Sequence, residues 1–419
     1  MSLLKKLIPQ PLKNVYHRGV AFVTAASFGF PGRGLTIVGV TGTNGKTTTS
    51  EMIYQILLAS GKKAALASTI KFALPSGEHI NTSKFTTLSP LKLNRFLKEA
   101  HREGVTHVVL EVSSHALDQH RTLGIPIAVA ALTNLTREHL DYHKSMENYC
   151  RAKARLFRKA KAAVINADSD HRDCFVRATH GTKLFYSTKD ATADLVAKDI
   201  QLDFGKTEFR LGEERIELRL PGLFNVENAL AALGAARLLG LDEAAAAKAL
   251  GAISGIPGRM ELVPNNRGLD LVIDYAVTPD AFRKLYASVL PLKIPGTMII
   301  HVFGSCGDRD RGKRPILASI ASEKADTVIL TNEDPYTENP ERILDEVEQG
   351  MTTKKDRDYF RIFDRRAAIH KALEMAERGD IVLFTGKGAE TSIAYADHRE
   401  PWNEHQAIEE ELAQIGRAE

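Results

Sequence analysis

From residue 34 onward, the chain alternates short apolar runs with longer stretches of helical spacing. The run GLTIVGV (34–40) is apolar and partly β-branched, and KTTTSEMIYQILLAS (46–60) follows it with apolar residues at three- and four-residue intervals. The runs THVVLEV (106–112) and IPIAVAALTNL (125–135) are separated from it and from each other by further polar and helical stretches. This alternation predicts an α/β protein with a mainly parallel sheet.

The pattern changes twice along the chain. Residues 181–222 hold short alternating runs that predict an antiparallel patch added to the parallel sheet. The segment GIPGRMEL (255–262) is rich in turn-forming residues, and a second α/β alternation follows it. We therefore divide the chain into a short lead-in (1–34), a central domain (35–256) and a C-terminal domain (257–419).

Composition and charge are those of an ordinary globular protein, with 43% hydrophobic and 26% charged residues. A formal net charge of +4 over 419 residues is too small to indicate nucleic acid as the main partner. Cys150, Cys174 and Cys306 are scattered and form no CxxC pair. This spacing argues against a structural zinc site and against a disulfide framework, and it favours a reduced, cytoplasmic setting.

The first residues, MSLLKKLIPQPLKNVYHRGVAF (1–22), mix apolar and basic residues and are interrupted by Pro9 and Pro11. They lack the longer apolar region of a signal peptide, and no run approaches the ~18 residues of a membrane span. The segment is either a short amphipathic surface element or a simple lead-in, and we favour the lead-in. We expect no stable membrane insertion.

The stretch VTGTNGKTTTS (40–50) has the context of a phosphate-binding loop, because it follows a strand and opens a helix. Backbone N–H groups at a helix N-terminus attract phosphate, Lys46 would neutralise it, and Thr47 can hold Mg²⁺. Val40 stands where the common motif has its first glycine, so the loop is a variant. The expected fold class is a central P-loop-type ATPase domain followed by a C-terminal Rossmann-like α/β domain.

Three more residues carry candidate chemistry. Glu111 ends a predicted strand, where a carboxylate can hold the Mg²⁺ that bridges nucleotide phosphates. His139 lies in TNLTREHLDYH after the next strand. Lys153 shares a helix face with apolar neighbours, and a free ammonium buried there would be costly, which hints at pairing or modification. Taken singly, a solvent-facing Glu111 and a structural His139 are the favoured interpretations, and Lys153 could be one of six solvated basic residues between 151 and 161.

Ten segments together resemble the Mur ligases, in the order in which that family carries them. The likeness runs from about residue 34 to about residue 400, and it is strongest to the type that adds the third amino acid to UDP-N-acetylmuramoyl-dipeptide. The segments are GVTGTNGKTTT, EVSSHALDQHR, TNLTREHLDYH, YCRAKARLF, PGLFNVENALAA, GIPGRMELV, DYAVTPDAF, FGSCGDRDRGKRP, TNEDPYTENP and TGKGAE. In that family the shortened loop is normal.

The resemblance implies roles for individual residues. Those expected to bind ATP are Gly42, Thr43, Asn44, Gly45, Lys46, Thr47, Thr48, Asn225, Arg259 and Asp274. Those expected to contact the acceptor are Thr86, Thr87, Ser113 and Arg121. Those expected to form the pocket for the incoming amino acid are Arg314, Glu333, Asp334, Tyr336, Gly386 and Glu390. Lys153 matches the family lysine that becomes a carbamate and, with Thr47, Glu111 and His139, serves two Mg²⁺ sites.

The implied reaction is an ATP-dependent ligation of cell-wall precursor synthesis. The γ-phosphate passes to an acceptor carboxylate, and an amine then attacks the acyl phosphate. Positive charge from Lys46 and Mg²⁺ would stabilise the transfer between anions, and closure of the C-terminal domain would exclude water. The expected partners are a nucleotide-sugar peptide and an amino acid, and the expected state is a monomer.

The chain departs from the family pattern in several places. Only about 34 residues precede the loop strand, whereas the family carries a whole N-terminal domain that holds the UDP end. Val277 and Ala389 replace family histidines. Tyr336 replaces an arginine that grips the distal carboxylate of meso-diaminopimelate, and Glu333 and Asp334 add acidity. We therefore expect a basic amino acid such as lysine or ornithine to be preferred over meso-diaminopimelate.

Other functions stay open at this point. A ligase of the same fold with an acceptor that lacks UDP, such as a folate or another peptide, is one alternative. A P-loop GTPase or kinase is another, but the chain has no NKxD motif for guanine. A non-enzymatic ATP-binding module is the third, and it would have no need of Glu111, His139 and Lys153 together.

Overall fold

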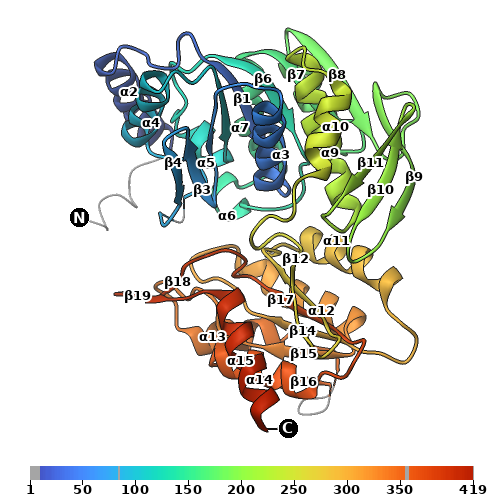
Figure 1. Ribbon diagram of the computed structural model, residues 1–419. Coiled ribbons are helices and arrows are strands. Elements are labelled where there is room, and N and C mark those ends of the chain that lie inside the picture. Colours follow the sequence, from blue (N-terminus) through green and yellow to red (C-terminus); the bar gives the residue numbers. More distant parts are fainter. Residues whose placement is uncertain (1–9, 84, 354–357, 419) are drawn as a thin grey trace.

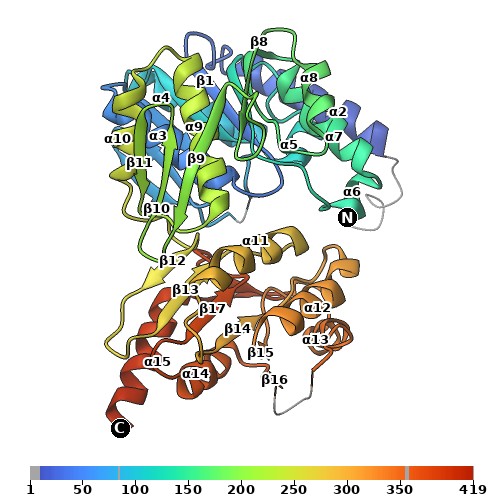
Figure 2. The ribbon, with the colours of Figure 1, turned by 90° about the vertical axis from the view of Figure 1, so that its right-hand side faces the viewer.

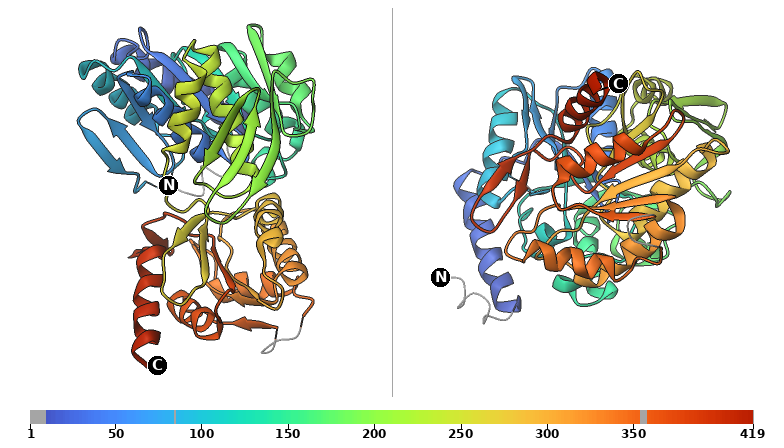
Figure 3. Two further views of the ribbon diagram at one scale, coloured as in Figure 1. Left: turned by 45° about the vertical axis from the view of Figure 1, so that its right-hand side comes forward. Right: turned by 90° about the horizontal axis from the view of Figure 1, so that it is seen from below.

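The computed structural model describes residues 10–83, 85–353 and 358–418, which fold around two large sheets (Figure 1). The strands of the first sheet come from residues 36–218, and those of the second from residues 261–385. We call residues 10–256 the first part and residues 257–418 the second part. The turn-rich segment 255–262 runs from one to the other. Figure 3 shows the two parts as distinct lobes.

The first sheet has the strand order β11-β10-β9-β8-β7-β6-β1-β5-β2-β3-β4. Its strands are β1 (Thr36–Thr41), β2 (Ala64–Ala67), β3 (Lys71–Leu74), β4 (Gly77–Ile80), β5 (His107–Glu111), β6 (Ile127–Leu132), β7 (Ala160–Asn166), β8 (Thr182–Ser187), β9 (Leu195–Leu202), β10 (Thr207–Leu211) and β11 (Glu214–Leu218). The central strands β1, β5 and β6 are parallel and nearly fully buried, which explains their continuous apolar runs.

Helices cover both faces of this sheet. On one face lie α3 (Lys46–Ala59), α9 (Leu223–Leu238) and α10 (Glu243–Gly251). On the other lie α4 (Pro90–Arg102), α5 (Ser114–Asp118), α7 (Met146–Phe157) and α8 (Arg172–Ala178). The short α6 (Leu140–His143) precedes α7, and α2 (Gln10–Ser27) packs against α4. The predicted α/β class with a P-loop-type parallel sheet is therefore confirmed.

Four details differ from the sequence-based expectations. The strand β8 pairs in parallel with β7 and β9, so only β9, β10 and β11 form the expected antiparallel patch. The hairpin of β3 and β4 was not predicted. The lead-in contains α2, while residues 1–9 lie outside the described part. Cys150 and Cys174 form a disulfide, so the expectation of unpaired cysteines is wrong: α7 and α8 pack together and bring the two side chains into contact.

The second part is a second α/β sandwich. Its strands are β12 (Glu261–Val263), β13 (Asp270–Asp274), β14 (Ile299–Phe303), β15 (Thr327–Leu330), β16 (Tyr359–Arg361) and β17 (Ile381–Thr385), in the order β12-β13-β17-β14-β15-β16. All neighbours are parallel except β12 and β13. The strands β18 (Ser392–Ala394) and β19 (Arg399–Pro401) form a separate small sheet.

Helices also cover both faces of the second sheet. Its helices are α11 (Pro279–Val289), α12 (Arg314–Lys324), α13 (Pro340–Glu348), α14 (Arg365–Met375) and α15 (Glu404–Ala418), with 3-10 turns η1 (Leu290–Leu292) and η2 (Arg311–Lys313). The helices α11 and α12 pack on one face, and α14 and α15 on the other. Figure 2 shows α11 on the side that faces the first part. Loops at the carboxyl ends of strands in both sheets meet there, as ligand sites do in open α/β sheets.

Candidate active site

The loop between β1 and α3 is packed so closely that only glycine fits at two positions. A β-carbon on Gly42 would lie 1.8 Å from Thr133 Oγ1, and one on Gly45 would lie 2.2 Å from Asn228 Oδ1. Gly45 also has a φ angle of 80°, in the left-handed region that glycine enters at little cost. The chain can therefore turn sharply from β1 into α3.

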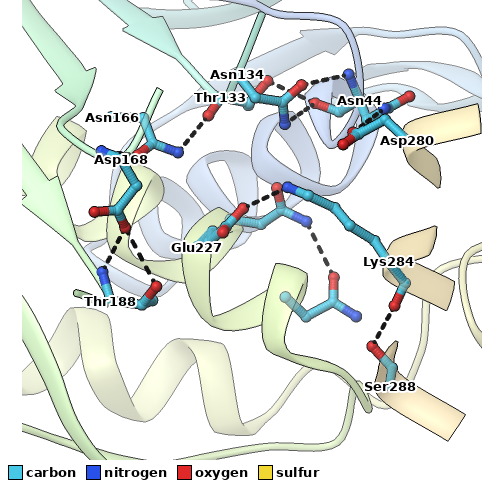
Figure 4. Close-up of polar contacts among 12 residues, drawn as sticks. Asn44, Thr133, Asn134, Asn166, Asp168, Thr188, Glu227, Asp280, Lys284 and Ser288 are labelled. Carbon is cyan, nitrogen blue, oxygen red and sulfur yellow. Dashed lines mark hydrogen bonds and ion pairs between the residues drawn. The ribbon is translucent and has the colours of Figure 1, made fainter. Parts of the chain in front are cut away.

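The loop after β6 fixes the shape of this turn (Figure 4). The backbone N–H of Thr43 donates to the carbonyl oxygen of Asn134, and that of Asn44 donates to Asn134 Oδ1, both at 2.9 Å. Thr133 Oγ1 donates to the carbonyl oxygen of Asn44 at 2.6 Å. Among the described residues no side chain caps the N-terminus of α3, so its first N–H groups are available to an anion.

Lys46 is the first residue of α3, and its ammonium folds back over the loop to donate to the carbonyl oxygen of Thr43 at 2.7 Å. Burial lowers its pKa; the negative charge of Glu111 opposes this effect, and the positive charge of Arg259 adds to it. A phosphate at the helix N-terminus would restore charge balance around this ammonium.

Glu111 ends β5 beside the loop. Its Oε2 accepts hydrogen bonds from Thr47 Oγ1 at 3.1 Å and from the backbone N–H of Thr69 at 2.7 Å, and its Oε1 accepts from Thr69 Oγ1 at 2.9 Å. The carboxylate is therefore held in one orientation next to the hydroxyl of Thr47. These are two oxygen ligands of the kind that Mg²⁺ prefers.

His139 directly precedes α6 and lies in a group of aromatic rings. Its ring centroid is 4.8 Å from that of His115. Burial, then the neighbouring His115 and Lys153, lowers the pKa of His139, so the imidazole is neutral and can act as a ligand. The preceding residue, Glu138, is 3.3 Å from Lys313 Nζ of the second part.

Lys153 is fully buried on α7, as its helix face predicted. Its Nζ donates to the carbonyl oxygen of Gly42 at 2.6 Å and lies 4.6 Å from the centre of the Tyr149 ring. Burial, and then the charge of Lys46, lowers the pKa of Lys153 well below its usual range. An uncharged amine is the form that can attack CO₂, so the environment fits the expected carbamate.

A cavity of about 270 Å³ lies between the two parts, with the loop as one wall. The predicted residues that line it are Thr43, Asn44, Gly45, Lys46, Thr47, Thr48, Thr86, Glu111, His139, Arg259, Asp274 and Glu390. The predicted residues outside its lining are Gly42, Thr87, Ser113, Arg121, Lys153, Asn225, Arg314, Glu333, Asp334, Tyr336 and Gly386. Most phosphate and metal candidates are thus brought together, with Gly42 and Lys153 outside the lining, and five of the six amino-acid candidates also lie outside it.

The acceptor candidates form a connected group beside Glu111. Thr87 Oγ1 donates to the carbonyl oxygen of Glu111 at 3.1 Å and accepts from the backbone N–H of Ser113 at 2.9 Å. Arg121 Nη1 donates to the carbonyl oxygen of Thr87 at 2.9 Å. The guanidinium of Arg121 also lies 5.8 Å from the ring centre of Phe85, a residue that is 60% exposed.

The three remaining nucleotide candidates differ in their surroundings. Asn225 is buried, and its Nδ2 donates to the carbonyl oxygen of Pro221 at 2.8 Å. Arg259 Nη2 lies 3.4 Å from Thr47 Oγ1, which joins the second part to the loop. Asp274 accepts from the backbone N–H of Met260 at 2.9 Å; burial raises its pKa, and Arg259 opposes that effect.

The acidic residues expected in the amino-acid pocket are largely neutralised by Lys387, a residue that the sequence analysis missed. Lys387 Nζ is fully buried and lies 2.8 Å from Asp334 Oδ1 and 2.7 Å from Glu390 Oε2. Burial alone would lower its pKa, but the two carboxylates raise it. Of the three, only Glu390 reaches the cavity.

Glu333 is enclosed behind the loop after β17. A β-carbon on Gly386, whose φ is 103°, would lie 2.8 Å from Glu333 Oε2. Cys306 Sγ donates to Glu333 Oε1 at 2.8 Å, and burial raises the pKa of Glu333. The acidity that the sequence suggested at this position does not reach the cavity surface.

In the GDRDRGKRP segment, Arg309 lies at the cavity, where Arg314 was expected. Arg314 is fully buried, with its Nη1 2.9 Å from Glu338 Oε2 and 2.7 Å from Glu346 Oε2. Arg309 lines the cavity, and its guanidinium lies 5.1 Å from the ring centre of Tyr336. Sequence reasoning missed Arg309 because the segment offers several basic residues and periodicity does not show which faces the cleft.

Polar contacts connect the loop and α9 to α11 across the cleft (Figure 4). Asn44 Nδ2 donates to Asp280 Oδ2 at 2.9 Å, and Lys284 Nζ lies 2.9 Å from Glu227 Oε2. These contacts link the phosphate-binding loop directly to the position of the second part. Nothing in the sequence pattern pointed to them, because each pair is separated by more than fifty residues.

The comparisons with known proteins agree with this geometry. Residues 40–236 match the Mur ligase middle domain, and residues 258–388 match the Mur ligase glutamate ligase domain. The UDP-N-acetylmuramoyl-L-alanyl-D-glutamate–2,6-diaminopimelate ligase of Caldanaerobacter subterraneus subsp. tengcongensis is 37% identical over 94% of this chain and 82% of its own length. The ligase of the same name from Trichormus variabilis is 41% identical over 89% of this chain and 76% of its own length.

A solved structure of a ligase with this name superposes with a TM-score of 0.63 at 36% identity, over 92% of this chain and 79% of the other. The match of two consecutive domains agrees with the loop and Glu111 found together at the cavity, and with Lys153 buried behind the loop against the carbonyl oxygen of Gly42. The chain therefore belongs to the Mur ligase family and is an ATP-dependent ligase that forms carbon–nitrogen bonds.

Proposed function

We propose that the protein uses ATP to activate the free carboxylate of a UDP-N-acetylmuramoyl-dipeptide and joins it to the amino group of an amino acid, as a step of peptidoglycan precursor synthesis. The observation that carries this proposal is one cavity with the phosphate-binding loop and Glu111 on one wall and Arg309 and Glu390 on the other. The names of the related ligases point to the same acceptor.

The phosphate-binding wall supplies the charges for the first step. The uncapped N-terminus of α3 and Lys46 would hold the transferred phosphoryl group, while Thr47 and Glu111 would hold Mg²⁺. When bound, Mg²⁺ neutralises charge between the reacting anions. Among the described residues no three His, Cys, Asp or Glu side chains converge as a metal cage.

A second Mg²⁺ site needs the carbamate of Lys153. CO₂ would convert its neutral amine into an anionic oxygen ligand, and His139 would complete the protein's share of that site. The low pKa of Lys153 supports this assignment, because a protonated amine does not react with CO₂.

The wall of the second part would bind the incoming amino acid. Arg309 provides a guanidinium that can pair with a carboxylate in two parallel hydrogen bonds, and Glu390, whose Oε2 is paired with Lys387, lines the same wall. Tyr336 lies beside Arg309 and offers no such fork of donors, so a lysine or ornithine side chain suits this wall better than a second carboxylate.

We propose that a monomer is the active unit and that it works in the cytoplasm, where ATP is available. No helix in the described ranges is long and apolar enough to cross a membrane.

The function is tested by measuring ADP release while each substrate is omitted in turn. We expect release to require the acceptor and the amine together, with a product whose mass is the sum of the two less water. Lys46→Ala is the matched negative control. ADP release at the same rate without the acceptor would overturn the proposal. If ADP were released only with an acceptor that lacks UDP, and not with the UDP-linked one, the alternative acceptor class would be assigned.

A further inference from the structure

Helix α2 turns its larger apolar face away from the protein. The face, which we call the α2 stripe, consists of Leu12, Val15, Tyr16, Phe22 and Val23, which are 62%, 70%, 69%, 57% and 66% exposed. Their spacing places them on one side of the helix. The opposite side is buried through small residues, Ala21 and Ala25. The helix thus attaches to the described part of the protein by its smaller apolar face.

The surroundings of the stripe are basic. The first fifty residues contain no Asp or Glu, and the first acidic residue is Glu51. On α2 itself, Lys13 and Arg18 lie on the two flanks of the stripe, as their positions in the helical repeat require. The neighbouring α4 exposes Lys92, Arg95, Lys98 and Arg102 against a single acidic residue, Glu99.

Figure 3 shows α2 on the outer edge of the first part, with α4 beside it. None of the α2 stripe lines the cavity between the two parts. A partner on this face would therefore leave the candidate active site open.

We propose that the α2 stripe docks the protein on a lipid bilayer that contains anionic phospholipids. An exposed apolar stripe flanked by cations, on a helix that carries no acidic residue of its own, is the pattern of helices that lie in the plane of a membrane interface. One carboxylate beside the helix, that of Asp118, accepts a hydrogen bond from Asn14 Nδ2 at 3.1 Å. The stripe would enter the boundary between headgroups and acyl chains, and Lys13, Arg18 and the cations of α4 would face anionic headgroups. A second copy fits less well, because it would bring two predominantly basic faces together.

Docking of this kind is reversible and lies along the surface. Each cation near an anionic surface contributes roughly a fivefold gain in binding affinity. The affinity for the bilayer should therefore fall as the ionic strength rises. The inference does not depend on which amino acid or acceptor the enzyme uses.

The test is sedimentation of the full-length protein with vesicles of phosphatidylglycerol and phosphatidylcholine, compared with vesicles of phosphatidylcholine alone. We expect binding to the anionic vesicles only, weakened by added salt. The double variant Lys13→Gln/Arg18→Gln should bind roughly thirtyfold more weakly, and Phe22→Ser/Val23→Ser should also lose binding. Both variants should keep the wild-type rate of ATP turnover.

Matched controls come from other surfaces of the chain. Ile294→Ser removes an apolar side chain that is 55% exposed on the second part, and Lys198→Gln/Arg219→Gln removes two exposed cations from the first part. Neither should change vesicle binding. Equal loss with the controls, or no binding of wild-type protein to anionic vesicles, would overturn the proposal. The proposal would also be overturned if the wild-type protein were a dimer in solution and Phe22→Ser/Val23→Ser made it monomeric, because the stripe would then bind a second copy.

Discussion

Replacing Arg309 by alanine should damage catalysis, whereas replacing Arg314 should damage the fold. Arg309 lines the cavity, and Arg314 is fully buried between Glu338 and Glu346. A charge-assisted hydrogen bond to a carboxylate contributes about 1.5–3 kcal/mol. Loss of Arg309 should therefore lower kcat/KM for the amino acid by roughly 10- to 150-fold, mainly through KM, with little change in Tm.

Arg314→Ala removes the partner of two carboxylates. Breaking a buried ion pair costs about 3–5 kcal/mol, but the side chains of Glu338 and Glu346 are 21% and 19% exposed, so water recovers part of this cost. We expect a loss of roughly 2–3 kcal/mol, seen as a fall in Tm of about 5–10 °C. The amino-acid KM should stay near its wild-type value at a temperature where the variant is folded.

The assay is steady-state kinetics with varied amino acid, combined with thermal unfolding of the same preparations. Arg311→Ala is the matched control, because Arg311 belongs to the same segment, is about half exposed and pairs with Glu346 at the surface. Arg311→Ala should change neither the KM for the amino acid nor Tm by much. The placement of the amino-acid site would be refuted if Arg314→Ala raised the KM for the amino acid without lowering Tm, and Arg309→Ala left this KM unchanged.

Three further predictions concern the first step and the choice of substrate. Lys46→Ala and Glu111→Ala should each reduce ATP turnover by at least about a hundredfold while circular dichroism stays that of the folded protein; near wild-type turnover would remove that residue from the mechanism. Lys153 should carry an added 44 Da in native mass spectra at neutral pH, and Lys153→Ala should be inactive and partly rescued by short carboxylates; an unmodified lysine in active enzyme would contradict the carbamate. Tyr336→Arg should shift the preference toward meso-diaminopimelate in competition with lysine, and an unchanged preference would mean that Tyr336 does not contact the side chain.

Much of the fold was readable from the sequence because its signals are local. Continuous apolar runs predicted the buried parallel strands, and the glycine loop predicted the turn from β1 into α3. The pairing of β8 was not readable, because an alternating run fits a parallel edge region as well as an antiparallel one. The disulfide of Cys150 and Cys174 was missed because their closeness depends on the packing of α7 on α8.

The site divides in the same way. Residues tied to a motif, such as Lys46 and Glu111, lie where the sequence suggested, since a strand end fixes their position. The residues on the cavity wall of the second part were harder to predict from the sequence. Lys387 neutralises Asp334 through contacts between separate loops, and Arg309 rather than Arg314 faces the cavity. Such choices depend on tertiary packing, which leaves no periodic signal in the chain.

The central claim is that an acceptor carboxylate is activated as an acyl phosphate at the β1–α3 loop. It is tested most directly by following oxygen from the acceptor carboxylate into the released phosphate. With the acceptor labelled by ¹⁸O in both carboxylate oxygens, the account predicts one ¹⁸O atom in each phosphate released, because the oxygen that attacks the γ-phosphorus leaves with it when the amine attacks the carbonyl carbon. Phosphate without ¹⁸O, formed in ordinary water while the amide is still made, would contradict the account.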